Sequence, residues 1–257
     1  MRLDFFSGWT RRGRLLRLAV VAALTGVAAA GAQIAPPAYD TAWTEADRAG
    51  VGDTRELVVL VHGMGRSPLS MWLLEQRLEH DGYRVVSFGY RSTRGNVAQL
   101  GAALGRRAAL RTGDASRVHF IGHSLGTVII RSMLVDARPE RLGRVVMLAP
   151  PNQGSAAADR WARWVAWAMP HIRELSTRPQ STARMLALPR GVEVGIIAGA
   201  RDRKVRVAET YLAGASDHRV VDGFHSWLMN RTDVHRLIVH FLRAGRFSPA
   251  EPLADAA

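Results

Sequence analysis

The chain has 257 residues, 47% of them hydrophobic, a length and composition that predict one large α/β domain with a well-buried core rather than two domains. It contains no cysteine, which excludes disulfides and thiolate metal sites. The formal net charge is +13, but the arginines are scattered and not massed in one tract with aromatic residues, so we expect no nucleic-acid partner.

Residues 1–32 have the pattern of an export signal. Four arginines lie at 11–17, fifteen uncharged residues follow, and the segment ends with Ala-Gly-Ala at 30–32. These features are typical of a signal peptide and predict cleavage after Ala32, giving an exported, periplasmic or secreted protein. The alternative is an uncleaved inner-membrane anchor, although the apolar run is shorter than the roughly 18 to 20 residues that span a bilayer. A cytosolic leader or a wrongly assigned start is a third interpretation.

Residues 33–54 lack clear periodicity and are predicted to be a linker. From Glu56 onward, short and almost wholly apolar segments alternate with stretches long enough for a helix. The segments predicted as strands are 56–63, 83–90, 117–124, 143–150, 192–200 and the weaker 218–223. Such a pattern indicates a mostly parallel sheet covered by helices on both faces. We therefore predict an α/β domain of about six strands over residues 55–246, followed by a tail at 247–257.

Helical periodicity is found at 68–82, 96–113 and 232–245, and another helix directly follows residue 124. In an open parallel sheet, functional groups collect on the loops beyond the carboxyl ends of the strands. The polar candidates at these ends are His62, Ser124, Asn152, Asp202 and His225.

The segment GHSLG, residues 122–126, joins a strand to a helix with no loop between them. A serine at a turn is often a helix cap, but a cap does not explain the two glycines. A turn this sharp brings backbones together, so the positions two before and two after Ser124 must lack a bulky Cβ. The serine is then strained, with its oxygen projecting from the tip of the sheet, as in the G-x-S-x-G motif. We predict that Ser124 is a nucleophile.

A serine hydroxyl is a weak nucleophile and needs a neighbouring base, which a carboxylate orients. Most of the nine histidines fall on predicted helices, in strands or within the serine motif: His80, His235, His240, His119, His123 and His218. His225 instead lies just past the last strand, in a glycine-containing loop from which its ring can reach the sheet tip. We predict His225 as the base.

The carboxylate should precede the base on the exit loop of the neighbouring strand. Asp202 follows the strand at 192–200 and comes 23 residues before His225. Asp217 and Asp222 lie too close in sequence to His225 to occupy a separate strand end. Acyl transfer also needs donors for an oxyanion, and the predicted donors are the backbone N–H groups of Leu125 and of Met64, in the HGMG loop.

Together these motifs resemble the α/β-hydrolase superfamily, and within it bacterial lipase-like serine esterases. The resemblance covers residues 56 to about 246 and includes HGMG at 62–65, GHSLG at 122–126, APPNQGS at 149–155, DRKV at 202–205 and DGFHSWL at 222–228. It implies an α/β-hydrolase fold with a Ser124, Asp202 and His225 triad, acting on a small-molecule or lipid ester with no metal and no cofactor. The chain departs from the pattern at Arg203, where such lipases often have glycine. It also lacks the strands that normally precede the HGxG strand, so we expect a trimmed sheet.

About 35 residues between APPNQGS and the strand at 192–200 are predicted to form a small helical cap, at about 155–190. In it, Trp161, Trp164 and Trp167 are spaced three apart and share one side of a helix. Two interpretations stay open. In the first, the three tryptophans bind substrate, together with Asn152, or touch a membrane surface. In the second, they pack as part of the core. A thioesterase, an amidase or a non-catalytic protein that binds apolar ligands is compatible with the same pattern.

Overall fold

The computed structural model describes residues 55–167 and 169–248, and all structural statements below concern these residues. The predicted signal segment, the predicted linker and most of the predicted tail lie outside them. Within the described ranges, no helix combines the length and the apolar character that crossing a membrane would require.

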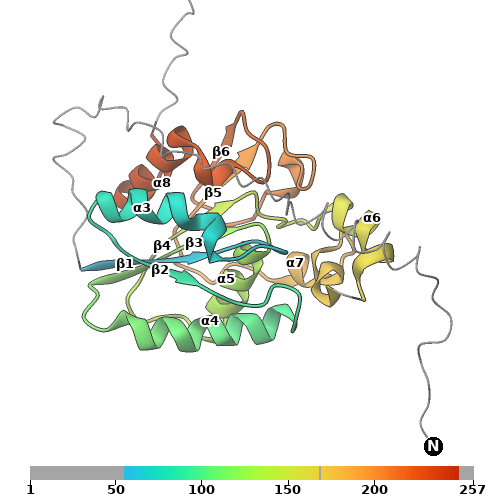
Figure 1. Cartoon of the computed structure of the whole chain (residues 1–257), viewed down its shortest axis with the longest axis horizontal. Helices are drawn as coiled ribbons and strands as arrows, with labels where there is room; N and C mark the ends of the chain where they lie inside the picture. Colours follow the sequence, from blue (N-terminus) through green and yellow to red (C-terminus); the bar gives the residue numbers. More distant parts are fainter. Residues whose placement is uncertain (1–54, 168, 249–257) are drawn as a thin grey trace, which may run out of the picture. The chain divides into compact units, whose positions relative to one another are not determined.

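The domain is built on a six-stranded parallel sheet in the order β2-β1-β3-β4-β5-β6 (Figure 1). The strands are β1 (Glu56–Val61), β2 (Arg84–Phe88), β3 (Arg117–His123), β4 (Leu142–Leu148), β5 (Val194–Gly199) and β6 (Asp217–Val221). All six predicted strands are confirmed, and so is the α/β-hydrolase architecture of a trimmed sheet. The strand order reverses between β1 and β3, and in open α/β sheets such a switch point marks the crevice in which ligands bind.

Helices cover both faces of the sheet (Figure 1). They are α3 (Trp72–His80), α4 (Val97–Thr112), α5 (Leu125–Asp136) and α8 (Thr232–Ala244). Helices α3 and α8 pack together on one face, and α4 packs with α5 on the other. The three predicted helices are confirmed, although the first begins as a 3₁₀ turn, η1 (Pro68–Met71). Helix α4 starts at a capping box in which Asn96 and Gln99 bond each other's backbone N–H, and α8 ends at left-handed Gly245.

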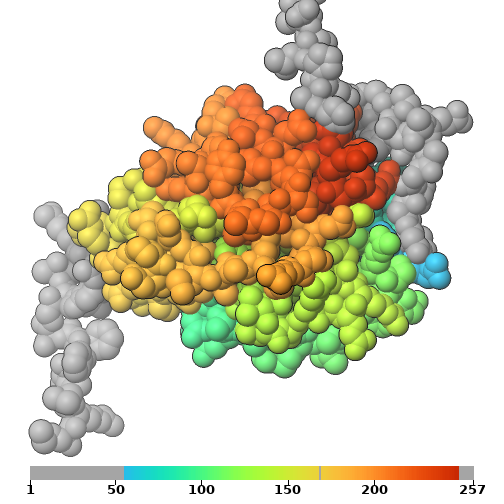
Figure 2. Space-filling model, turned by 180° about the vertical axis from the view of Figure 1, so that it is seen from behind, coloured from blue at the N-terminus to red at the C-terminus, as the bar shows by residue number. Residues whose placement is uncertain are grey.

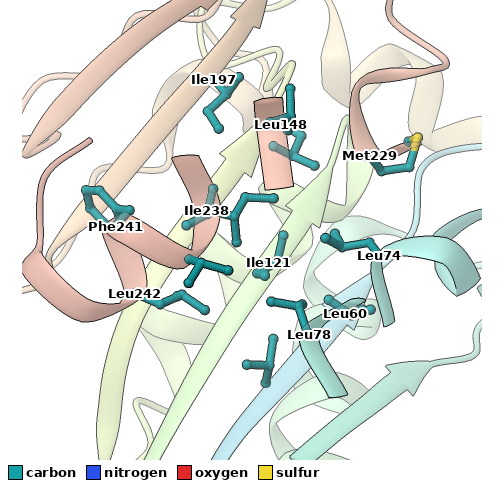
Figure 3. Packing of buried hydrophobic residues seen from close by; sticks show 14 of the residues in the cluster. Leu60, Leu74, Leu78, Ile121, Leu148, Ile197, Met229, Ile238, Phe241 and Leu242 are labelled. Atoms are coloured by element: carbon teal, nitrogen blue, oxygen red, sulfur yellow. The ribbon is translucent and has the colours of Figure 1, made fainter. Parts of the chain in front are cut away.

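A cluster of buried hydrophobic side chains fills the space between the sheet and the helices α3 and α8 (Figure 3). Strand residues pointing to this face meet helix residues at helical spacing, and those labelled in Figure 3 are Leu60, Leu74, Leu78, Ile121, Leu148, Ile197, Met229, Ile238, Phe241 and Leu242. Because alternate strand residues face α4 and α5 instead, the central strands are apolar over most of their length, as the sequence pattern indicates.

Phe247 packs against the end of the domain. Its buried ring packs on Phe241 with the ring centroids 5.0 Å apart, and its N–H donates to Asp217 over 2.8 Å. The folded domain therefore includes this residue, which closes the far side of α8.

The long segment after β4 lies beyond the carboxyl ends of the strands (Figure 1). It holds the short elements α6 (Ala156–Val165), η2 (Pro170–Leu175) and α7 (Thr182–Met185). The Ser155 hydroxyl donates to the Lys204 carbonyl over 2.6 Å, and the Ala156 N–H donates to Glu209 over 3.0 Å. These bonds attach the start of the segment to the loop after β5, and in the space-filling view its yellow atoms lie against the orange atoms of the later chain (Figure 2).

Candidate active site

Ser124 occupies the sharp turn between β3 and α5. Its backbone has φ 53° and ψ −121°, a conformation that non-glycine residues rarely adopt, and its side chain forms no cap bond to the helix. A Cβ on Gly126 would collide with the Val61 carbonyl, and one on Gly122 would lie 2.8 Å from the Thr127 nitrogen. The two glycines are therefore required by backbone contact, as the sequence predicts, and the hydroxyl stays free for chemistry.

His225 and Asp202 lie side by side, although they come from the exit loops of β6 and β5. The His225 Nδ1 is 2.6 Å from the Asp202 Oδ2, and each residue is only 7% exposed. The other carboxylate oxygen accepts the backbone N–H groups of Lys204 (2.7 Å) and Val205 (2.9 Å). Because a carboxylate only accepts, Nδ1 carries the proton, and the Nε2 of a neutral ring is left as the basic nitrogen.

His123 joins the loop of His225 to the turn of Ser124. Its Nε2 donates to the His225 carbonyl over 2.8 Å, and the two rings lie 4.8 Å apart between centroids. Since His123 directly precedes Ser124, this bond brings the predicted nucleophile and the predicted base to the same place. The structure thus places the three predicted triad residues at the carboxyl ends of the strands.

The competing candidates are engaged elsewhere. The His218 Nε2 bonds the Thr210 hydroxyl over 2.8 Å, and its ring stacks on Tyr211. Asp217 accepts backbone N–H groups, and Asp222 pairs with Arg201 at the surface. None of these contacts approaches the turn at residue 124.

The HGMG loop after β1 is held by residues from the end of β2. The Tyr90 hydroxyl donates to the His62 carbonyl over 2.6 Å, and the two rings stack at 4.1 Å. The Gly65 N–H donates to the Ser92 hydroxyl over 2.8 Å, from a left-handed conformation with φ 68°. These contacts fix the backbone on both sides of Met64. Sequence reasoning missed Tyr90 and Ser92, because nothing in their local pattern reveals which loop they support.

Leu125 is buried as the first residue of α5. The first N–H groups of a helix have no partner within the helix, so the backbone at this position is available to a ligand. Among the described residues, no cluster of three or more histidine and acidic side chains could hold a metal ion.

Asn152 and the tryptophans differ in exposure. Asn152 is buried, its Oδ1 accepts from Arg131 (3.1 Å) and its Nδ2 donates to the Thr210 carbonyl (2.7 Å), so its contacts favour a structural role over substrate binding. Trp161, Trp164 and Trp167 are 37%, 58% and 62% exposed, which argues against core packing. Helix α6 buries Ala157, Ala158 and Val165 and presents Trp161 and Trp164 outward. Trp167 lies in the turn after the helix, where its Nε1 donates to the Trp164 carbonyl over 2.9 Å, so the predicted shared side of a helix holds for the first two tryptophans alone.

His123 gives a testable pH dependence. Burial, and then the charges of His225 and Arg66, hold its pKa well below the ordinary value of 6.5. The unfolded state therefore binds a proton below pH 6.5 that the native state does not, so the free energy of unfolding falls on acidification, by up to about 1.4 kcal/mol per pH unit. His123→Gln keeps a side-chain donor but removes the titration. We expect a smaller loss of stability from pH 6.5 to 5 in urea unfolding. Parallel profiles for the two proteins would contradict this assignment.

Comparison with known proteins identifies the class. Residues 56–185, just over half of the chain, match the family model of the alpha/beta hydrolase fold. The chain therefore belongs to the α/β-hydrolase fold family. No curated protein sequence resembles it closely enough to match.

Solved structures agree on the fold. The mature form of the Bacillus licheniformis lipase BlEst2 superposes with a TM-score of 0.57 at 17% identity, covering 73% of this chain and 91% of the lipase. The Pyrococcus furiosus esterase Pf2001 gives a TM-score of 0.54 at 18% identity, covering 81% of this chain and 95% of the esterase. At these identities, the likeness establishes the architecture, and the chemistry has to be argued from the site.

Proposed function

We propose that the protein is a serine hydrolase that cleaves carboxylic esters through an acyl-serine intermediate. The observation that carries the proposal is the 2.6 Å bond between His225 and Asp202, on a loop that His123 attaches to the turn of Ser124. A nucleophile, a base and an orienting carboxylate in this chain order are the parts of the α/β-hydrolase triad. The lipase and esterase neighbours are consistent with this chemistry.

The mechanism follows from the hydrogen bonds. The Nε2 of His225 takes the proton of the Ser124 hydroxyl as Oγ attacks the ester carbonyl, and Asp202 stabilises the imidazolium that forms. The backbone N–H groups of Met64 and Leu125 donate to the oxyanion of the tetrahedral intermediate. His225 then returns the proton to the leaving alcohol, and water releases the acid by the same steps. The chemistry needs no metal and no cofactor.

A panel of p-nitrophenyl esters of increasing acyl length tests this function, with Ser124→Ala as the matched control. We expect nitrophenol release by the parent chain and almost none by the variant. A thioester and an anilide of the same acyl group measure the rival activities, because the same triad attacks all three carbonyl classes. If the parent chain hydrolyses none of the esters, the thioester or the anilide, the proposal is contradicted.

The exposed tryptophans of α6 and of the turn after it are proposed to contact the acyl chain or a lipid surface, because a segment that presents large aromatic rings outward is unusual for a surface without a partner. Such a contact fits a protein exported by the segment at 1–32, which we also propose. Lipid esters would then reach the site from a membrane surface or from bulk solution.

Trp164→Ala tests the acyl contact. We expect kcat/KM for an octanoyl ester to fall about 10- to 100-fold more than kcat/KM for an acetyl ester, because only the long chain uses the lost surface. Because the ring is 58% exposed, the melting temperature should change little. Leu110→Ala, at an exposed position on α4, is the control for losing an apolar surface residue. A lowered melting temperature with equal losses on both esters would identify Trp164 as structural instead.

A further inference from the structure

The N–H of Met64, the predicted oxyanion donor, belongs to the peptide unit between Gly63 and Met64. In a trans peptide the C=O and N–H groups point in opposite directions, and the described part of the chain contains no cis peptide bond. The Gly63 carbonyl accepts from the His62 Nδ1 over 3.0 Å and from the Arg66 N–H over 3.3 Å. These two bonds hold the carbonyl and thereby set the direction of the Met64 N–H. Among the described residues that N–H has no acceptor, so it is available to a ligand.

This peptide unit lies against the turn of the candidate nucleophile. A Cβ on Gly63 would be 2.8 Å from the His123 Nδ1 and 3.3 Å from the Ser124 Cβ, so no side chain fits between the loop and the turn. Hydrogen bonds weaken steeply as the donor angle falls, and an oxyanion donor contributes most when it is already oriented. A small rotation of the unit would therefore weaken the bond from Met64 to the oxyanion.

Tyr90 holds the peptide unit before this one. Its hydroxyl donates to the His62 carbonyl over 2.6 Å, and its ring lies within 11° of parallel to the His62 ring, with the centroids 4.1 Å apart. The Phe88 ring stacks on Tyr90 in turn, at 5.4 Å. Burial raises the pKa of Tyr90, so the hydroxyl stays protonated and remains a donor. The Tyr90 side chain thus fixes both the backbone and the ring of His62, and that ring holds the Gly63 carbonyl.

Ser92 holds the peptide unit that follows. The Gly65 N–H shares this unit with the Met64 carbonyl, and it donates to the Ser92 hydroxyl over 2.8 Å. Ser92 is only 4% exposed, and Gly65 has a φ of 68°, a conformation that glycine adopts without strain. The exit loop of β2 therefore fixes the units on both sides of the peptide between Gly63 and Met64.

We propose that Tyr90 and Ser92 are positioning residues for the oxyanion hole. They hold the HGMG loop in its catalytic conformation through contacts within the protein, so the Met64 N–H is oriented before an ester binds. The inference rests on the proposed function and adds two residues of the β2 exit loop to it. Both residues act through Met64 and not on the ester itself.

Tyr90→Phe and Ser92→Ala test the proposal by removing one hydroxyl each. Phenylalanine keeps the ring stack and alanine keeps most of the volume, so both variants should fold. We expect kcat/KM for p-nitrophenyl acetate to fall about 10- to 100-fold in each, because losing an oxyanion donor altogether costs about 100- to 1,000-fold. The double variant should lose less than the product of the two single losses, since both changes misdirect the same N–H.

Hexyl trifluoromethyl ketone provides a readout that a merely structural role would not move. The Ser124 Oγ adds to its carbonyl carbon, the hydroxyl proton passes to His225, and the hemiketal oxygen carries the negative charge of an oxyanion. The inhibition constant should rise in each variant by the factor by which kcat/KM falls. Partial unfolding cannot imitate this rise, because the inhibition constant does not depend on how much of the enzyme is folded. The pH profile of kcat/KM should keep its shape, because the bond between His225 and Asp202 is untouched.

Tyr83→Phe and Ser87→Ala are the matched controls. Tyr83 is buried directly before β2, and the Ser87 hydroxyl within β2 donates to Glu75 over 2.8 Å. Each control removes a hydroxyl of the same kind without touching the contacts of the HGMG loop. Both should leave kcat/KM and the inhibition constant as they are in the parent chain.

The outcomes are distinguishable from failure of the proposed function. Unchanged kcat/KM in both variants, with the parent chain active, would overturn the inference and leave the esterase standing. A fall in kcat/KM without a matching rise in the inhibition constant would do the same. A variant that does not fold would show that its hydroxyl is structural, and would overturn the positioning role of that residue. If the parent chain hydrolyses no ester, the proposed function and the inference both fail.

Discussion

Replacing Ser124 with alanine is expected to lower kcat/KM for ester hydrolysis by about five to six powers of ten. The reason is that a triad acts as a unit, and removing its nucleophile leaves only binding and oxyanion stabilisation. The fold should survive, because the serine side chain makes no cap bond and the strained φ of 53° is imposed by the backbone of the turn. Alanine is held in the same conformation, so the melting temperature should stay near that of the parent chain.

The measurement is the rate of p-nitrophenyl acetate hydrolysis, together with a thermal unfolding curve. Ser124→Gly is a useful second variant, because glycine tolerates a positive φ and should relieve strain while being equally inactive. Turnover within tenfold of the parent by either folded variant would show that the nucleophile lies elsewhere.

Asp202→Asn is expected to lower kcat by about four powers of ten with little change in fold. In the structure, one carboxylate oxygen accepts the backbone N–H groups of Lys204 and Val205, and the other faces His225. These two N–H groups need an acceptor, so the amide oxygen of asparagine has to occupy the position of Oδ1. The NH₂ group of asparagine then faces the Nδ1 of His225. The ring must then accept at Nδ1 and carry its proton on Nε2, where it can no longer remove a proton from Ser124.

Asp222→Asn is the matched control, since Asp222 also precedes His225 but pairs with Arg201 at the surface. It should keep nearly full activity. In the double variant of Asp202→Asn and His225→Ala, the losses should be far from additive, because both changes disable the same base. An active Asp202→Asn enzyme, or an inactive Asp222→Asn enzyme, would require a different carboxylate.

The sheet could be predicted because strands buried on both faces must be mostly apolar, and five such segments stand out in the sequence. The sixth strand, β6, is less apolar and only partly buried, so its pattern is weaker. The turn at Ser124 could be predicted for a similar reason, since only glycine fits where the backbones of β1 and α5 approach each other. In both cases, a contact that any version of the fold must make restricts the residue types in a short segment. The segment's sequence therefore predicts the contact.

Other features depend on which segments meet in three dimensions, and the sequence does not record this. The spacing of Trp161, Trp164 and Trp167 predicts a shared side of a helix, but not whether that side faces solvent or core. Asn152 follows a strand like the other candidates, yet its amide points to Arg131.

The central claim is that Ser124 is an activated nucleophile, and covalent labelling with a fluorophosphonate tests it most directly. The probe reacts with serines that a neighbouring base activates, so it reports the nucleophile without knowledge of the substrate. We predict one equivalent of label per folded chain, located on Ser124 by peptide mass spectrometry, with no labelling of Ser124→Ala and slow labelling of His225→Ala. A folded chain that takes up no label, or that takes it up on another residue, would contradict the account.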